Sequence, residues 1–480
     1  MNFQAQILAE PVLEFGGRGA HIDPRVGLME FGPLQPVPGD RIKIGVIGTG
    51  ATVDGFEKFL ERCKAGIPGK PSPLINLHPG FPGMGNTNPF RCVFETVGSM
   101  QRRIPQSDIR KIAALPKQSD AIKAAAELFG DQARALLEGS SRPDVVVAAL
   151  PVELIQKIVN ARAVDESEED DVDADAPLDF RDLFKSQALL LNVPTQIVWP
   201  TLWDDDAKVP RKIRNTMRTV QDPATRAWNL LNALFYKAGK APWRLPRKEG
   251  ELAVSFLGIG FYRDLDGQRL LTSTAQMFDE RGRGLILRGA KARTDRGDRH
   301  PYLERADAYD LVTRSVKAFR AEHLHPPARL VIMKTSRFEK VEAEGMLAAA
   351  DELEIPHRDL VWVSEGGHQT LVREGDYPPL RGTSVQIGQD LMLFTRGSVP
   401  YYRTYPGMRV PRPLLLRPFS CDTPIGELGA EVLALTKMNW NTTQFDQALP
   451  IPIRAARQVG RILKYVSYGQ LERSDYRYYI

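Results

Sequence analysis

The chain is poor in cysteine, lacks long apolar runs and shows no targeting segment at its first residues. Its three cysteines, Cys63, Cys92 and Cys421, lie far apart, which excludes a disulfide framework and a CxxC zinc site. The apolar run at 145–150 is far shorter than the roughly 18 residues that cross a membrane. We therefore expect no membrane association and place the protein in the reducing cytoplasm.

A basic surplus is present once a single acidic run is set aside. The 480 residues carry 64 Lys and Arg against 59 Asp and Glu, and eight of the acids lie at 165–175. This uneven surplus fits a polyanionic partner, and nucleic acid is the first candidate. The apolar fraction of 42% is large enough for a core, and the length predicts two or three domains.

The first half of the chain alternates predicted strands with predicted helices, which is typical of a parallel sheet covered on both faces. The strands are predicted at 42–47, 91–97, 144–149 and within 189–199, and the helices at 53–65, 119–138 and 222–239. Residues 66–90 are rich in Gly, Pro and Asn and are predicted to form loops. The acidic run at 165–175 is predicted to be a solvated loop inserted in this domain.

The second half follows a different order. Three predicted strands joined by short turns come first, at 252–262, 269–278 and 284–289. Helices at 301–322 and 339–353 then alternate with strands at 329–333 and 359–364, which is the order of an RNase H-like fold. The predicted fold class is α/β, with an N-terminal extension at 1–40, a Rossmann-like domain at 41–243 and an RNase H-like domain at 244–480.

A glycine-rich turn, GVIGTG at 45–50, invites a nucleotide-binding interpretation. A dinucleotide fingerprint needs its third glycine where this chain has Val53, which would obstruct close packing of a helix on a strand. No acidic residue closes a strand about 20 residues further on. We reject the fingerprint, and a nicotinamide-dependent enzyme remains a rival hypothesis that NADH binding would test.

Basic and amide side chains recur at helical spacing on either side of one predicted strand. Arg181 and Lys185 are four residues apart in a predicted helix, so both project from one face. Asn229 and Lys237 are eight apart in another helix and again share a face. Gln196 lies in the strand between these two helices. Together these residues predict an anion pocket.

The end of the chain, YRYYI at 476–480, is aromatic and apolar, which predicts a docked tail because free tails tend to be polar. A docked terminal carboxylate is suited to ligate a divalent cation beside a phosphate. Just upstream, a helix is predicted around 453–466. At 100° per residue, its four cations fall within about 80° of arc, opposite its apolar residues. This basic stripe fits a phosphate backbone and consists of Arg454, Arg457, Arg461 and Lys464.

Taken jointly, these segments resemble the MID and PIWI domains of an Argonaute. The block LTKMNWN at 435–441, the run at 450–461 and the terminal Tyr-Tyr-Ile look like the end of a PIWI domain. The resemblance implies that the guide 5′ phosphate is held by Arg181, Lys185, Gln196, Asn229 and Lys237. It also implies a Mg²⁺ ion at this phosphate, held by Gln196 and the C-terminal carboxylate of Ile480.

Two positions depart from the family pattern. Many members carry a tyrosine at Arg181, where it stacks on the first guide base, and many long members carry an extra basic residue at Ala233. The resemblance covers residues 40–480, which leaves no room for N-terminal and PAZ domains before the MID domain. The chain therefore resembles a short prokaryotic Argonaute.

Members of that group work with a second protein that carries an APAZ domain fused to an effector. The effector is a TIR or sirtuin-like NAD-hydrolysing domain, or a nuclease. The resemblance thus implies a heterodimer that binds a short guide RNA and a complementary single-stranded DNA target and that assembles further on activation. It implies a role in abortive defence against plasmids and phage, through NAD depletion where the effector hydrolyses NAD.

The carboxylates that slicing Argonautes use for two-metal cleavage are replaced in this chain. The acidic place in the first PIWI strand holds Gly260, the second holds Thr335, and the last position looks like Asn439. None of these side chains is an anionic Mg²⁺ ligand. We expect a catalytically inactive PIWI domain, with the enzymatic activity in the partner. An active guide-directed nuclease with displaced carboxylates is the alternative.

Overall fold

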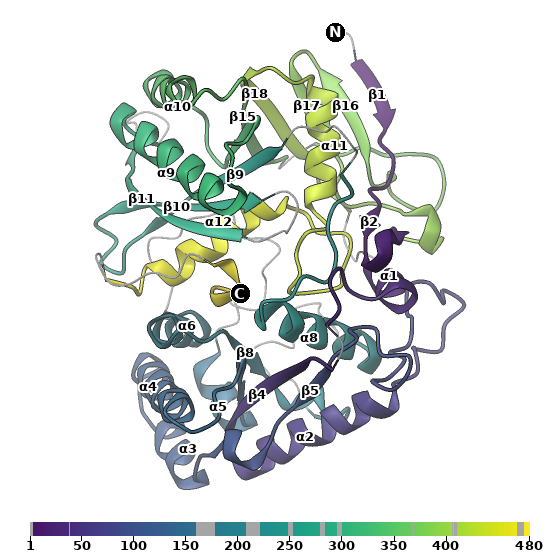
Figure 1. Cartoon of the computed structure of the whole chain (residues 1–480), viewed down its shortest axis with the longest axis vertical. Helices are drawn as coiled ribbons and strands as arrows, with labels where there is room; N and C mark the ends of the chain where they lie inside the picture. Colours follow the sequence, from purple (N-terminus) through teal and green to yellow (C-terminus); the bar gives the residue numbers. More distant parts are fainter. Residues whose placement is uncertain are drawn as a thin grey trace.

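The computed structural model describes residues 3–37, 39–159, 178–207, 221–247, 253–278, 284–294, 300–366, 369–405, 407, 410–467 and 475–480. The acidic run predicted as a loop at 165–175 lies outside them. Two sheets organise the described residues, one in the lower and one in the upper half of Figure 1. None of the helices in the described part of the chain has the length and apolar composition that a bilayer crossing needs.

The lower sheet is parallel. Its central strand pairs with three others, and the order is β5-β4-β7-β8, with β6 also on β4. The strands are β4 (Arg41–Gly48), β5 (Val93–Glu95), β6 (Gln101–Arg103), β7 (Val145–Ala149) and β8 (Thr195–Val198).

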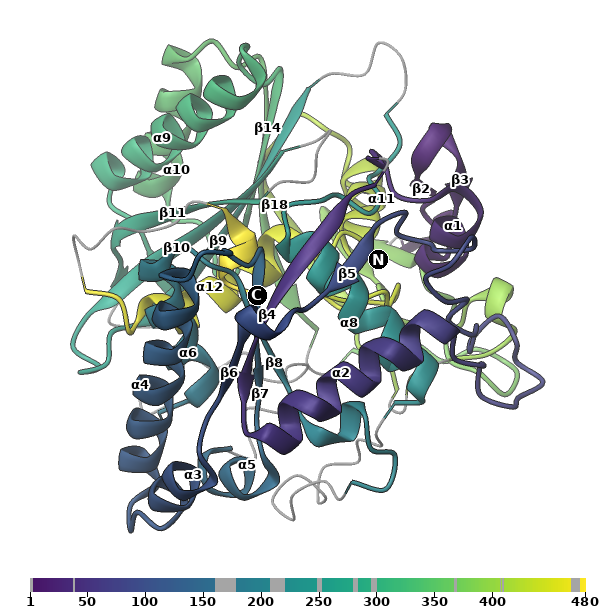
Figure 2. The same ribbon diagram turned by 60° about the horizontal axis from the view of Figure 1, so that its bottom comes forward.

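Helices cover both faces of this sheet because its buried side chains alternate. Ile44 and Val46 belong to a core that includes α2 (Gly50–Ala65) and α8 (Pro223–Lys237). Ile47 belongs to a second core, on the other face. The helices of that face are α3 (Gln106–Ala113), α4 (Gln118–Leu137), α5 (Val152–Ile158) and α6 (Phe180–Leu191). Figure 2 shows the two helix layers on either side of the strands, which confirms the predicted doubly wound domain.

The glycine-rich turn of the rejected fingerprint is filled by its own side chains. Thr49 caps α2, and Thr52 Oγ1 donates to Ala149 O at 2.8 Å. A Cβ on Gly48 would lie 2.3 Å from Thr52 Oγ1 and 2.6 Å from Ala149 O. Gly48 is therefore explained by close packing of strand, helix and neighbouring strand.

The upper sheet joins nine described strands in the order β1-β16-β17-β18-β15-β14-β9-β10-β11. The meander β9-β10-β11 is antiparallel, and β14 and β15 follow in parallel to β9, which confirms the predicted RNase H-like order. The strands are β1 (Phe3–Ile7), β9 (Val254–Arg263), β10 (Leu270–Phe278), β11 (Gly284–Lys291), β14 (Arg329–Lys334), β15 (His357–Glu365), β16 (Thr383–Ile387), β17 (Asp390–Leu393) and β18 (Leu414–Cys421).

Two helix pairs cover this sheet. One face packs against α9 (Arg305–His323) and α10 (Lys340–Glu352) through a core of its own. The other face packs against α11 (Ile425–Leu435) and α12 (Ile451–Leu463), whose core is continuous with that of α2 and α8 in the lower half. The close approach of α12 is visible at Gly258, where a Cβ would lie 2.1 Å from Pro452 O.

The described part of the predicted N-terminal extension at 1–40 begins with a strand of the upper sheet. β1 pairs with β16, and β2 (Leu13–Glu14), β3 (Ala20–His21) and α1 (Pro24–Phe31) follow. Glu10 binds Arg381 at 3.0 Å and Lys437 at 2.8 Å, so the segment is clamped to the upper core.

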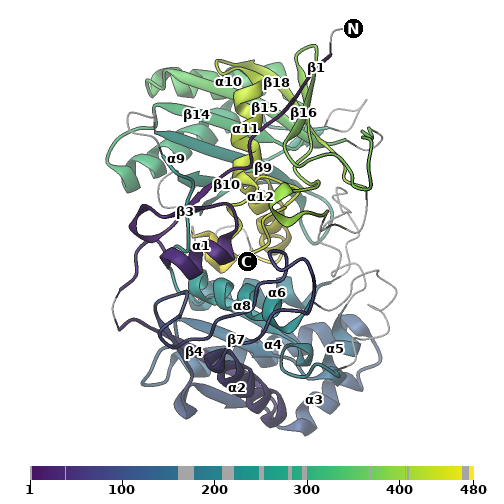
Figure 3. The same cartoon turned by 90° about the vertical axis from the view of Figure 1, so that its right-hand side faces the viewer.

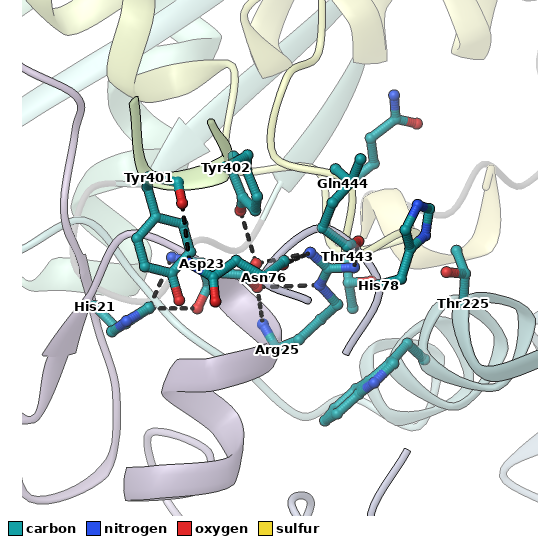
Figure 4. A network of polar contacts seen from close by, with 12 residues as sticks. His21, Asp23, Arg25, Asn76, His78, Thr225, Tyr401, Tyr402, Thr443 and Gln444 are labelled. Atoms are coloured by element: carbon teal, nitrogen blue, oxygen red, sulfur yellow. Dashed lines mark hydrogen bonds and ion pairs between the residues drawn. The ribbon is translucent and has the colours of Figure 1, made fainter. Parts of the chain in front are cut away.

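A buried polar network ties this extension to both halves, as Figure 4 shows. Asp23 is fully buried and binds Arg25 at 2.7 Å. Tyr402, from an upper loop, donates its hydroxyl to the same carboxylate at 2.7 Å, and Arg25 Nη1 donates to Leu77 O in the loop that follows α2. Asn76 of that loop donates in turn to Tyr401 O at 3.0 Å. The extension therefore acts as a joint between the two halves.

Candidate guide-end cavity

A cavity of about 260 Å³ lies where the two halves meet, close to the C-terminal marker in Figure 1. Helices α6 and α8 and strand β8 line it from below, and α12 lines it from above. Its polar wall comprises Asp179, Arg181, Lys185, Gln196, Lys237, Asn441, Arg461 and Ile480. An apolar wall beside them comprises Leu150, Ile158, Val159, Phe180, Ile197 and Trp199. The structure thus brings together four of the five predicted phosphate ligands and Ile480.

Lys185 is held in place by oxygen atoms of β8 and of the C-terminal residue. The side chain of Asp179 caps α6 by accepting from Asp182 N at 3.1 Å, and Lys185 follows on the buried face of this helix. Its ammonium donates to Thr195 O at 2.9 Å and also to Ile480 O. Lys185 therefore connects α6 and β8 to the docked C-terminal residue, which follows η6 (Tyr476–Tyr478) in the chain.

Lys237 is the most isolated cation of the cavity. It is only 1% exposed, and its ammonium donates to Gln196 Oε1, which is a neutral acceptor. Burial, and secondarily the charge of Arg181, lowers the pKa of Lys237 well below its ordinary value. Lys237 forms no ion pair with a carboxylate among the described residues. A buried charge without a counterion is unfavourable, so the cavity favours an incoming anion.

The remaining cations are held by one carboxylate. Asp182 is fully buried and accepts from Arg181 Nη1 at 2.8 Å and from Arg461 Nε at 3.1 Å. Burial alone would raise the pKa of Asp182, but Arg461 and Arg181 outweigh it, so this pKa lies below its ordinary value. Burial and the neighbouring Asp182 raise the pKa of Asp179. Arg181 and Arg461 are thus oriented toward the cavity from opposite halves.

The oxygen atoms of the cavity suit a hard cation that arrives together with a phosphate. Gln196 Oε1 and Ile480 O lie in one wall, and the buried Asn441 Oδ1 has no hydrogen-bond partner among the described residues. Amide and carboxylate oxygens and water are the ligands that Mg²⁺ prefers, and a metal-bound water would satisfy Asn441. Because Lys185 and Lys237 already bind two of these oxygens, a cation alone would be repelled.

Asn229 does not line the cavity. It lies eight residues before Lys237 on α8, and its Oδ1 accepts from Thr442 Oγ1 at 3.0 Å and Thr443 N at 2.9 Å. Its Nδ2 donates to Gln221 at 3.0 Å. Eight residues of helix span about 12 Å, so a shared face does not bring the two side chains to one ligand. The structure assigns Asn229 to holding the 442–443 turn on α8.

Sequence reasoning missed Asp179, Asp182 and Asn441 as residues of this region. Asp182 lies three residues before Lys185, inside the segment already singled out, and an acid beside two helical cations was a usable signal. Asn441 belongs to the LTKMNWN block, but its place in the cavity depends on how α11 and α12 pack, which no local pattern shows.

Three cations of the predicted basic stripe lie on α12 and Lys464 is its C-cap, but all four already have partners. Arg454 donates to Gln447 at 2.8 Å, Arg457 lies 3.5 Å from Glu365, and Lys464 covers the ring of Tyr465. Arg461 lines the cavity described above. Two acids from other elements face these cations, Asp182 of α6 and Glu365 of β15. The sequence of the helix alone could not show them.

Two of the three positions predicted to lack a catalytic carboxylate, Gly260 and Thr335, lie side by side. Lys334 pairs with Ile259, so Thr335 and Gly260 come next on adjacent parallel strands, and Thr335 N donates to Ile259 O at 3.3 Å. Asn439 lies in the segment after α11, where the neighbouring Trp440 O accepts from Asn232 of α8. Among the described residues, no group of three or more His, Cys, Asp or Glu side chains is placed to hold a metal ion.

Many solved structures share this fold, and two Argonautes are among them. Clostridium butyricum Argonaute, bound to a guide DNA with a 5′ deoxycytidine and a 19-mer target DNA, covers 98% of this chain with a TM-score of 0.67 and 16% identity. Aa-Ago with externally bound siRNA covers 99% with a TM-score of 0.60 and 14% identity. The chain spans about half of each of these proteins, 54% and 56%. It therefore has the fold of Argonaute MID and PIWI domains.

No family model matches the sequence. No curated protein matches it either.

Proposed function

We propose that this chain holds the 5′-phosphorylated end of a short guide RNA and recognises complementary single-stranded DNA without cutting it. This proposal rests on the surroundings of Lys237, which is buried and whose described partner is the neutral Gln196. A terminal phosphate carries close to two negative charges and would supply the missing counterion. Arg181, Lys185 and Arg461 line the same cavity and would share its oxygens.

A Mg²⁺ ion accompanies the phosphate in this proposal, held by Gln196 and the carboxylate of Ile480. The ion would offset the repulsion between the phosphate and the terminal carboxylate. Arg454 and Arg457 of α12 and its C-cap Lys464 would contact the phosphate backbone of the guide and its target further along their path. Because these contacts neutralise phosphates, affinity falls with increasing salt, while base pairing alone supplies the sequence specificity.

The output of target recognition is assigned to a second protein. We propose an APAZ-domain partner that carries a TIR-like, sirtuin-like or nuclease effector, in a heterodimer that responds to invading plasmids or phage. The formation of a guide–target duplex would shift a conformational equilibrium of the heterodimer toward its active form, because the duplex binds that form better. Gly260 and Thr335 support a chain that does not cut, since neither side chain is an anionic metal ligand.

The test is a reconstitution of the chain with its partner and a 5′-phosphorylated RNA. Complementary DNA should form a ternary complex, stay uncut in Mg²⁺ and switch on NAD consumption or nucleic-acid degradation, whereas a scrambled DNA should do neither. Cutting of the paired DNA by the isolated chain would instead establish the nuclease alternative. Fluorescence quenching of the isolated chain by NADH would support a nicotinamide enzyme.

A further inference from the structure

The outermost strand of the upper sheet has one uncovered long edge. β1 pairs with β16 on one side, and among the described residues no strand pairs with its other side. Figures 1 and 3 show it at the margin of the molecule, beside β16 and away from the lower half. All five residues of β1 are exposed.

The register of β1 shows which backbone groups face outward. Leu8 N donates to Gly382 O at 2.9 Å, and the same register continues as Phe3 opposite Ile387. Hydrogen-bonded and non-bonded pairs alternate in an antiparallel ladder, so Gln4 and Gln6 direct their backbone groups toward β16. The N–H and C=O groups of the residues between and beside them therefore point outward, and these residues are Phe3, Ala5 and Ile7.

This edge lacks charge and proline, two features that usually prevent strands from associating. Neither β1, FQAQI, nor β16, TSVQI, contains a charged residue or a proline. Phe3 is 60% exposed and Ile7 62% exposed, on the face where Phe3 lies beside the exposed Ile387. An unprotected edge with exposed apolar side chains is a template for a further strand.

The sequence of β1 is complementary to itself. FQAQI reads symmetrically around Ala5, with an apolar residue at each end and a glutamine on each side. A two-fold antiparallel pairing about Ala5 would set Phe3 opposite Ile7 of a second copy, Gln4 opposite Gln6, and Ala5 opposite Ala5. The outward groups of residues 3, 5 and 7 would then all be satisfied. A register centred on Gln4 or Gln6 would leave part of them unpaired.

We propose that the free edge of β1 pairs with β1 of a second copy of this chain, joining two upper sheets into one. This inference goes beyond the proposed guide binding and does not depend on it. The cross-strand pair of Phe3 and Ile7 would extend the apolar stripe that Ile387 begins. The strands are short, so the buried area is smaller than that of a standard stable interface, and the dimer is concentration-dependent.

Sedimentation velocity over a concentration series tests the dimer. Ala5→Pro removes an outward N–H and leaves the inward groups of Gln4 and Gln6 in place, so it should weaken the dimer by at least about tenfold. Ala5→Val keeps the N–H and should keep the dimer. A parent chain that stays monomeric throughout would overturn the proposal, as would a dimer that Ala5→Pro leaves unchanged.

Charge placement tests the register. Phe3→Lys/Ile7→Lys sets like charges opposite each other and should abolish the dimer, whereas Phe3→Lys/Ile7→Glu sets opposite charges face to face and should restore it. Equal loss in both double variants would overturn the two-fold pairing about Ala5. Thermal midpoints of all variants within about 2 °C of the parent would show that the monomer is intact.

Discussion

Asp182 of α6 accepts a hydrogen bond from Arg461 of α12 at 3.1 Å, and this contact crosses the boundary between the two halves. The carboxylate is fully buried, while its other oxygen accepts from Arg181. The two arginines that face the cavity therefore share one counterion. This arrangement fixes both the cavity and the relative position of α6 and α12.

We expect Asp182→Asn to lower the free energy of unfolding by about 3 kcal/mol, because it leaves two cations without their buried counterion. Urea unfolding measures this loss. Asp131→Asn is a matched control, since its ion pair with Arg134 is exposed on α4 and should contribute less than about 0.5 kcal/mol. Equal effects of the two substitutions would contradict the role given to Asp182.

The same carboxylate predicts a pH dependence. The folded pKa of Asp182 lies below its ordinary value, so its contribution to stability is fully present above pH 3.8, the unfolded value. It is lost as the pH falls through the lower folded pKa. Acid unfolding of Asp182→Asn should therefore show a smaller loss of stability in this window than the parent. A parallel loss in both proteins would contradict the assignment.

Lys237→Met should separate binding from stability. Removing a buried, uncompensated ammonium should leave the free energy of unfolding of the empty protein unchanged or raise it by about 1 kcal/mol, although Gln196 loses a donor. Differential scanning calorimetry without nucleic acid measures this. A loss of more than about 2 kcal/mol would show that Lys237 is needed for folding rather than for a ligand.

Phosphate binding should take up protons through Lys237. Unfolded, this lysine titrates near 10.5, and its folded pKa is lower, so its contribution to the stability of the empty protein rises with pH between these values. A bound phosphate would raise the pKa again. Calorimetric titration of 5′-phosphorylated RNA at a series of pH values below 10.5, each in two buffers of different ionisation enthalpy, should show proton uptake that Lys237→Met lacks. Identical uptake in both proteins would argue against this linkage.

The cysteines should be unreactive in the folded chain. Burial raises the pKa of Cys63, Cys92 and Cys421 to about 12 in each case. The thiolate is the nucleophile, so labelling by an aromatic disulfide reagent at about pH 8 should be slow until the protein unfolds. Unfolding in guanidinium should expose three thiols per chain. Rapid labelling of all three thiols in the native protein would contradict the burial of Cys63 and Cys92 and the partial burial of Cys421.

Local patterns predicted the elements whose periodicity is strong and missed those that tertiary pairing creates. The strand at 42–47 and the helices at 53–65 and 119–138 appear as β4, α2 and α4 because their apolar residues recur at the right period. β1 escaped prediction because both of its faces are exposed, and it forms only through its register with β16.

The candidate site divides in the same way. Lys185, Gln196 and Lys237 meet because their segments belong to one parallel sheet and its helices. Asn229 lies on the same helical face as Lys237 but does not line the cavity. The acids that face the cations of α12 are Asp182 and Glu365, which are distant in sequence and therefore invisible on a helical wheel.

A comparison of one short RNA with a 5′ phosphate and with a 5′ hydroxyl tests whether the cavity holds a guide end. Both are titrated in Mg²⁺ against the chain with its partner, against Lys237→Met, and against Lys240→Met. The last variant is a matched control, since Lys240 binds Asp40 outside the cavity. The phosphate should raise the affinity by about tenfold or more in the parent and the control. Lys237→Met and EDTA should abolish that preference. Equal, purely salt-sensitive binding of both RNAs in the parent would contradict a guide-end cavity.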